Sequence, residues 1–289
     1  MRKKLVSSSH YLTEAKKKKR EAQKRKIFIF IALFVFVFVA LGALSRWSKL
    51  NIKQVEVSGN VVTDSKVIQE FVEKEISGNY LWVFPKSNFL IYPKGGIEKD
   101  LQNDFKIMKD LSIRLTGVNK LTVNFKEREG AYTWCGNDPA LGTSEDKCYF
   151  MDKDGYIFGE APYFSGDVFF KFFGQVSKDV DVPLGMSYFP DLFNKLISLR
   201  EATNGMGIKT SAYFIKPDGD IELYFSSNIP FPSKPKIIFP PNTNVEKMAE
   251  NLQTALSTEP LQTDFKKKFA KLVHIDLRYG NKVYYKFTQ

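Results

Sequence analysis

An uninterrupted apolar run near the N-terminus constrains this chain more than any other feature. Residues 27–44 read IFIFIALFVFVFVALGAL, 18 residues without a charged side chain. An α-helix rises about 1.5 Å per residue, so a helical run of this length extends about 27 Å, close to the thickness of a bilayer core. The run is too uniformly apolar for the core helix of a globular domain. It therefore predicts a single transmembrane helix over residues 27–44.

The charge distribution predicts how this helix is oriented. Residues 1–26 carry eleven Lys and Arg against two Glu, a net charge of +9, out of a formal +11 for the whole chain. The rest is nearly neutral, so the basic composition does not indicate nucleic-acid binding. The positive-inside rule places residues 1–26 in the cytoplasm and residues 46–289 outside the plasma (inner) membrane. A cleaved signal peptide is the alternative, because Ala40 and Gly42 form a small-x-small site, although the apolar run exceeds the usual signal core.

The segment after the helix predicts a small α+β domain over residues 50–128. Its apolar and turn residues indicate a strand up to Gly59-Asn60, and then a helix capped by Asp64. A second helix over 97–105 and two alternating strands over 111–115 and 121–125 follow. The predicted element order is β-α-α-β-β.

From residue 129 to residue 289 the pattern changes to strands with two helical interruptions. Asp154-Gly155 and Pro217–Gly219 are turn signals between aromatic or apolar strands. The spacing predicts helices over 191–202 and 245–256, and a closing hairpin over 272–287. We therefore expect an α+β fold in which a second domain packs an antiparallel β sheet on helices.

The closing hairpin allows its register to be predicted. Apolar residues recur at every second position, at Val273, Ile275, Leu277 and Tyr279 and again at Val283, Tyr285 and Phe287. Both sets reach the core if a three-residue loop pairs Tyr279 with Val283, Leu277 with Tyr285 and Ile275 with Phe287, or if an equivalent bulge does so. Because two residues follow Phe287, we expect the last strand to form a free sheet edge.

Cys135 and Cys148 are both predicted to lie outside the membrane, where disulfide bonds persist. They end two aromatic strand segments that flank a polar loop, so we expect a disulfide bond across the base of that loop. Such a bond would stabilise the fold by about 3 kcal/mol. Two unpaired thiols are the alternative, whereas a redox-active pair would require a closer Cys-x-x-Cys spacing.

Candidate catalytic and metal-binding residues are scarce. Two Cys and two His provide too few ligands for a zinc cluster, and His274 is the only His outside the basic tail. Ser144 and Lys147 match Ser-x-x-Lys, but in a polar loop, and Asp152–Gly155 resembles part of a calcium loop but fits a hairpin turn. We expect no catalytic residue, no cofactor and no metal site, and hence no enzyme.

Four segments in order carry a resemblance to a known family: VEVSGN at 55–60, FKER at 125–128, YFMDKDGYIF at 149–158 and HIDLRYGNKVYYK at 274–286. Together with the basic tail and the single span, they resemble the FtsQ/DivIB family of bacterial cell-division proteins over essentially the whole chain. The resemblance implies a POTRA domain at 50–128 and a β domain at 129–289.

The resemblance also implies a function, which is a non-enzymatic scaffold at the division septum that recruits and bridges division proteins. It implies that the last strand binds a segment of FtsB, which pairs with FtsL as a coiled coil, and that other membrane proteins of the divisome are partners. Arg278 and Tyr279 would anchor this contact, and Val283 to Lys286 would form the edge. Lys282 and Lys286 are alternatively ordinary lysines that protect a sheet edge. The residues implied in partner binding are Arg278, Tyr279, Lys282, Val283, Tyr284, Tyr285 and Lys286.

Two other functions remain open at this point. Another POTRA-containing envelope-assembly protein would share the first domain, but this chain has no room for a transmembrane barrel. A signal-anchored cell-wall enzyme would need a cluster of catalytic residues in the second domain, which the sequence does not indicate.

Overall fold

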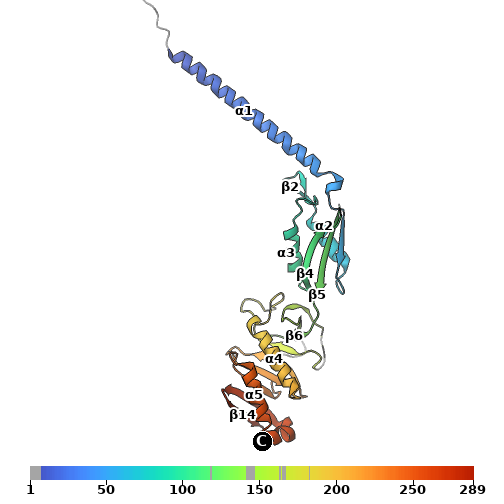
Figure 1. Cartoon of the computed structure of the whole chain (residues 1–289), viewed down its shortest axis with the longest axis vertical. Helices are drawn as coiled ribbons and strands as arrows, with labels where there is room; N and C mark the ends of the chain where they lie inside the picture. The colour runs from blue at the N-terminus through green and yellow to red at the C-terminus, as the bar shows by residue number, and fades with distance from the viewer. Residues whose placement is uncertain (1–7, 118, 141–146, 163, 165–166, 182) are drawn as a thin grey trace, which may run out of the picture. The chain divides into compact units, whose positions relative to one another are not determined.

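The computed structural model of the full chain describes residues 8–117, 119–140, 147–162, 164, 167–181 and 183–289 (Figure 1). Its first element is the long helix α1 (Ser8–Ser45), which contains the apolar run. By length and composition, this helix is suited to cross a membrane. The side chains of Phe28, Phe30, Phe34 and Phe36 are each at least 70% exposed. This exposure is consistent with a single-pass membrane protein, because apolar rings avoid water but not lipid.

The chain divides into two compact units, which we describe separately. The first consists of residues 1–100 and 110–125, and the second of residues 101–109 and 126–289. The elements after α1 up to residue 127 are η1 (Ser48–Leu50), β1 (Gln54–Ser58), α2 (Ser65–Glu75), β2 (Asn79–Tyr80), β3 (Phe84–Pro85), α3 (Lys94–Asp104), β4 (Met108–Leu115) and β5 (Lys120–Glu127).

The first unit contains a three-stranded sheet in the order β1-β5-β4, with β1 parallel to β5. Val55 of β1 and Leu121 of β5 face each other in register and are both buried. Helix α2 contributes the buried Ile68 and Val72. Asp64 caps α2 as predicted, since its side chain accepts a 2.9 Å hydrogen bond from Lys66 N. The small antiparallel hairpin of β2 and β3 was not predicted.

The second unit is built on a nine-stranded sheet. Its strands are β6 (Tyr132–Trp134), β7 (Tyr149–Met151), β8 (Ile157–Glu160), β9 (Lys171–Phe173), β10 (Thr210–Ile215), β11 (Ile221–Phe225), β12 (Lys236–Phe239), β13 (Leu272–Tyr279) and β14 (Lys282–Phe287). Its helices are α4 (Pro190–Gly205), α5 (Val245–Leu256), α6 (Leu261–Lys268) and η2 (Phe269–Lys271). The order across the sheet is β14-β13-β12-β11-β10-β9-β6-β7-β8.

The predicted α+β class is confirmed, but the prediction of an antiparallel sheet is wrong, because the sheet is mixed. Strand β9 is parallel to both β6 and β10, and β12 is parallel to β13. Two of these pairs are joined through helices, β9 to β10 through α4 and β12 to β13 through α5 and α6. A helical crossover returns the chain to the end of the sheet from which it left, so the next strand runs parallel. Strand β12 and helix α6 were not predicted from the sequence, and neither was this second crossover.

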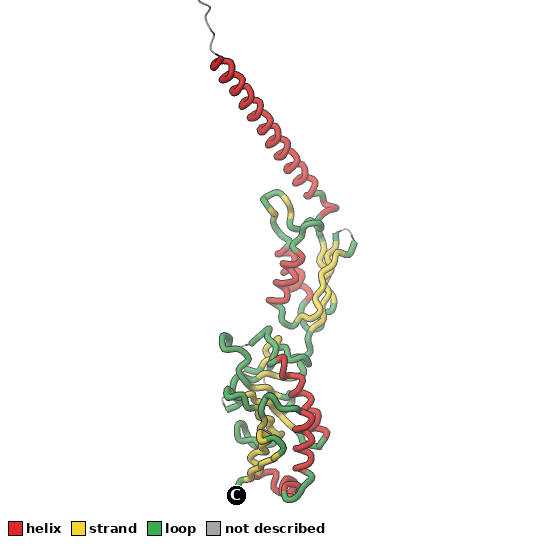
Figure 2. Tube along the Cα trace, turned by 60° about the vertical axis from the view of Figure 1, so that its left-hand side comes forward, coloured by secondary structure: helices red, strands yellow, loops and turns green. Residues whose placement is uncertain are grey.

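One face of the nine-stranded sheet carries the main core. Leu196 and Leu199 of α4 and Met248 and Leu252 of α5 pack there with buried strand residues such as Tyr213. Figure 2 shows these helices along one side of the strands. The hydroxyl of Tyr213 is satisfied within this layer, because it donates a 2.8 Å hydrogen bond to Leu196 O. A smaller buried cluster consists of Cys135, Phe173, Ala212, Phe214 and Tyr224.

The terminal hairpin differs from the predicted register. Tyr279 pairs with Lys282 across a two-residue loop, and a bulge between Asp276 and Tyr279 shifts the register, so that Ile275 pairs with Tyr285. The predicted three-residue loop and its three pairs are therefore wrong, whereas the alternative of a bulge is confirmed. The bulge allows Ile275, Leu277, Val283, Tyr285 and Phe287 to reach the same core. Tyr279 lies beyond the bulge and is 57% exposed, so it does not share the core face as predicted.

Candidate partner-binding edge strand

The two edges of the nine-stranded sheet are not equivalent. At the edge formed by β8, residues 185–187 cover the start of the strand: Ile157 N donates to Met186 O at 2.9 Å, and Gly185 N donates to Ile157 O at 2.8 Å. At the other edge, β14 pairs with β13. In the described part of the chain, no backbone hydrogen bond joins residues 282–287 to any segment besides β13. One side of β14 therefore presents main-chain donors and acceptors that are open to another strand.

The side chains of β14 alternate between two environments. Val283, Tyr285 and Phe287 are half-buried and pack against the main core. Lys282, Tyr284 and Lys286 are exposed on the opposite face. The first set fixes the strand to the protein, and the second set is free to contact a partner without disturbing the core.

Tyr279 and Tyr284 form an aromatic pair at the exposed end of the hairpin. Their ring centroids are 5.1 Å apart with an interplanar angle of 82°, and both rings are at least half exposed. The ring of Tyr285, on the other face of β14, lies 5.9 Å from that of Phe287. The ring of Tyr284 is thus accessible from outside the protein, whereas the ring of Tyr285 packs against the core.

Arg278 is held by two aspartates. Its Nη2 donates to Asp276 Oδ2 at 2.6 Å, its Nε donates to Asp276 Oδ1 at 2.9 Å, and its Nη1 donates to Asp220 Oδ2 at 2.7 Å. The side-chain hydrogen bond from Arg278 holds the pKa of Asp276 below its usual value, and the two carboxylates raise the pKa of Arg278. Arg278 is therefore a fixed positive charge beside the edge, with its orientation set within the protein.

Other charged and ionisable residues lie next to one another on β12, β13 and β14. His274 lies in register between Lys236 of β12 and Lys286 of β14. Burial lowers the pKa of His274, and the nearby Asp276 opposes this shift. Lys236 forms a 2.7 Å ion pair with the buried Glu222. Both residues that pair with His274 across the sheet are therefore lysines, whose side chains cannot accept a hydrogen bond from the imidazole.

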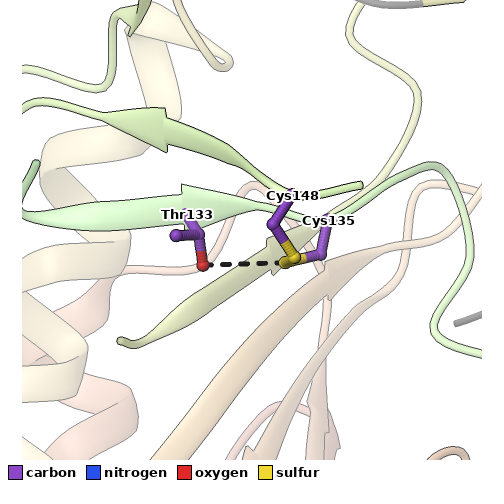
Figure 3. The surroundings of a disulfide bond; sticks show 3 residues. All are labelled: Thr133, Cys135 and Cys148. Atoms are coloured by element: carbon purple, nitrogen blue, oxygen red, sulfur yellow. Dashed lines mark hydrogen bonds between the residues drawn. A yellow bond between two sulfur atoms is a disulfide. The ribbon is translucent and has the colours of Figure 1, made fainter. Parts of the chain in front are cut away.

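A disulfide bond joins Cys135 and Cys148, which are 13 positions apart (Figure 3). Cys135 follows β6 and Cys148 precedes β7, so the bond closes the loop between two antiparallel strands. Thr133 Oγ1 lies 3.6 Å from Cys135 Sγ. A disulfide sulfur carries no proton, so the Thr133 hydroxyl is the donor in this contact. The described chain has no free cysteine.

The remaining sequence candidates are placed as follows. Ser144 lies outside the described residues. Asp152 Oδ1 accepts hydrogen bonds from Asp154 N and Tyr156 N at 2.9 and 3.0 Å, and its other oxygen pairs with Arg128. This carboxylate therefore has its own partners in the turn between β7 and β8. Among the residues that the structure describes, no group of three or more His, Cys, Asp or Glu could hold a metal ion.

The structure brings together residues that the sequence analysis did not combine. The pair Asp276 and Arg278 could have been found, because residues at i and i+2 of a strand lie on the same face. Asp220 lies 58 positions before Arg278, at the turn before β11, and no local pattern predicts that contact. The protection of β8 by residues 185–187 likewise has no local signal.

A scan of the chain against protein-family models found no match, and a search of curated proteins found none either.

Proposed function

We propose that this protein is a non-enzymatic, membrane-anchored scaffold of bacterial cell division, of the FtsQ/DivIB kind, and that it recruits and bridges division proteins during septum formation. The observation that carries this proposal is the open side of β14, on a sheet whose opposite edge is covered at the start of β8. A long accessible edge strand invites aggregation unless it is protected or serves a partner. Partner binding explains why β14 has an open edge whose only protecting residues among those described are Lys282 and Lys286.

The proposed contact is β-augmentation, in which an extended segment of the partner adds a tenth strand beside β14. Main-chain hydrogen bonds would provide affinity, and the exposed side chains would provide specificity. Lys282, Tyr284 and Lys286 face outward along the edge, and Tyr279 extends this surface at the hairpin end. The partner would be an FtsB-like segment carried on a coiled coil with an FtsL-like protein.

The first unit supports the same proposal. Its β1-α2-α3-β4-β5 order, with a small hairpin between the helices, agrees with the β-α-α-β-β order expected of a POTRA domain. In this proposal the unit docks other membrane proteins of the divisome close to the bilayer. The single apolar helix holds both units at the plasma membrane, with the basic tail in the cytoplasm and the units outside it.

Site-specific photo-crosslinking in cells tests this proposal most directly. A benzophenone amino acid replaces Tyr284, whose ring is exposed, and captured proteins are identified by mass spectrometry. The same probe at Glu160, an exposed residue of β8 at the opposite edge, is the matched control. Tyr285 is a weaker probe position, because its ring packs against the core.

A small single-pass coiled-coil protein captured at position 284, and absent at position 160, is the expected result. A fluorescent fusion should then form a ring at mid-cell. Capture of an envelope-assembly protein together with uniform envelope fluorescence would contradict a role in division. The absence of any adduct at position 284, with a correctly folded protein, would contradict the edge-strand contact.

A further inference from the structure

We propose that the β2–β3 hairpin of the first unit inserts into the lipid leaflet beside the end of α1. This inference goes beyond the proposed scaffold function, and it depends on the membrane span but not on any protein partner. The surface concerned is an apolar collar that consists of Trp47, Leu81, Trp82, Leu90 and Ile91. These side chains are 57%, 72%, 91%, 72% and 42% exposed, respectively.

The hairpin packs against the apolar part of α1 rather than beyond its C-terminal end. Phe84 contacts Phe38 edge to face, with ring centroids 5.2 Å apart. Val83 packs so closely on Gly42 that a Cβ atom there would collide with it. Phe38 lies six residues before Leu44, the last residue of the apolar run, which is about 9 Å along the helix axis. A hairpin that reaches this level of the helix lies at the depth of the lipid leaflet if α1 spans the membrane.

Hydrogen bonds fix this arrangement at the end of α1. Arg46 donates from Nε to Val83 O at 3.3 Å and from Nη2 to Trp82 O at 3.4 Å. Asn88, which is 3% exposed, donates to Ser45 O at 2.9 Å, and Asn51 donates to the same carbonyl at 3.1 Å. Carbonyl groups at the end of a helix lack partners within the helix, so these side chains both satisfy the carbonyl of Ser45 and attach the rest of the first unit to α1.

The tip of the hairpin has an unusual backbone. Leu81 and Trp82 both adopt positive φ angles, 46° and 66°, which non-glycine residues rarely do. Backbone strain of this kind concentrates at functional sites. This backbone conformation leaves the side chains of Leu81 and Trp82 exposed at the tip of the hairpin.

The rest of the collar lies beside the residues that follow the end of α1. Ile52 N donates to Ser87 O, and Phe89 N donates to Leu50 O, so the segment that carries Leu90 and Ile91 runs beside the residues that follow α1. Tryptophan favours the membrane–water interface, where its ring is buried and its N–H remains hydrated. A lipid surface is therefore the occupant that fits an exposed collar of Trp, Leu and Ile beside the end of a spanning helix.

The three tryptophans of the chain permit a direct test. The full-length protein is reconstituted in vesicles of phosphatidylglycerol and phosphatidylcholine, with and without phospholipid brominated in its acyl chain, which quenches nearby indole fluorescence. In the Trp47→Phe variant, only Trp82 and Trp134 emit. Trp134 is 3% exposed and bonded to Gly174 O in the second unit, so it provides the unquenched reference. The double variant Trp47→Phe/Trp82→Phe measures this reference alone.

We expect brominated lipid to reduce the Trp82 contribution roughly twofold or more and to leave Trp134 unchanged. Quenching of Trp47 in the Trp82→Phe variant, without quenching of Trp82, would overturn the inference while leaving the membrane span intact. If neither Trp47 nor Trp82 is quenched, both the span and the inference fail.

A second variant separates insertion from simple proximity to the membrane. Gly42→Leu adds apolar bulk where Val83 packs, so it should displace the hairpin and reduce the quenching of Trp82 by about half. Ala40→Leu adds similar bulk at an exposed position of the same helix and is the matched control. Equal quenching of Trp82 in the two variants would overturn the packing of the hairpin on the helix.

Discussion

The ring of Tyr284 stands nearly perpendicular to that of Tyr279, with centroids 5.1 Å apart across the terminal hairpin. The bulge between Asp276 and Tyr279 makes this contact possible, because it moves Tyr279 off the core face. The pair gives the open edge an exposed aromatic surface at one end. In the proposed complex, a partner strand would run past this surface along β14.

Tyr284→Ala should separate partner binding from folding. We expect it to lower the free energy of unfolding by less than about 1 kcal/mol, since an exposed cross-strand pair contributes little, and to abolish capture of the partner. Ile275→Ala, at a fully buried position of β13, should cost about 2–5 kcal/mol. Denaturant unfolding of the detergent-solubilised chain and affinity capture from cells measure the two effects. Wild-type capture by Tyr284→Ala would contradict the assigned role of this ring.

Arg278→Met should destabilise the second unit at neutral pH by about 1–3 kcal/mol, because it removes the main hydrogen-bond donor to the buried Asp276 carboxylate. The lowered pKa of Asp276 sets the pH dependence. The ion pair stabilises the fold fully above the unfolded-state pKa of about 3.9 and loses this contribution as the pH falls through the lower folded-state value. Unfolding at pH 7 and at pH 3 measures the change.

The difference between wild type and Arg278→Met should therefore be largest at pH 7 and shrink as the solution is acidified. Lys195→Met, at an exposed position of α4, is the control for removing a surface charge. A difference that stays constant down to pH 3 would show that Arg278 stabilises the unit by packing rather than by its charge.

Removal of the disulfide bond should lower the stability of the second unit and leave partner capture at β14 unchanged. The double variant Cys135→Ala/Cys148→Ala should lose about 3 kcal/mol of unfolding free energy, since the closed loop restricts the unfolded chain. Thermal unfolding of the wild type with and without dithiothreitol gives an independent measure. Capture at position 284 should persist in the double variant, because β6 and β7 lie far from β14 in the strand order.

Asn88→Ala should loosen the attachment of the rest of the first unit to α1. The variant removes the buried amide that donates to Ser45 O and the oxygen that accepts from Leu90 N at 3.0 Å. We expect a loss of about 1–3 kcal/mol in the stability of the first unit and no change in the second. Hydrogen exchange of the full chain in detergent resolves the two units. Asn60→Ala is the control, because this half-buried Asn also bonds to a main-chain carbonyl, that of Thr63.

The sequence by itself predicted those features that depend on neighbours along the chain. The apolar run over 27–44 indicated the helix that is suited to span a membrane, and Asp64 marked the start of α2. The alternation in 272–287 predicted the terminal hairpin and, through the need to bury both apolar sets, a bulge or a longer loop. Each of these follows from local periodicity or from a single capping residue.

Contacts between distant segments decided the rest. Strand β12 has only four residues and no strong local signal, and it is placed by its pairing with β11 and β13. That placement turns the expected antiparallel sheet into a mixed one. Two-residue strands such as β2 and β3 likewise depend on what they pack against, here the ring of Phe38 and the backbone at Gly42 on α1.

The candidate site was likewise predictable only in part. The sequence predicted the last strand, and its alternation determined which of its residues face the core. A free edge at the last strand was expected from the sequence, whereas only the tertiary structure decided that Arg278 is held by Asp220 and that residues 185–187 cover β8. Which strand lies at an edge depends on how all the other strands of the sheet pair. Pairing between remote segments depends on packing of the whole sheet rather than on any local pattern.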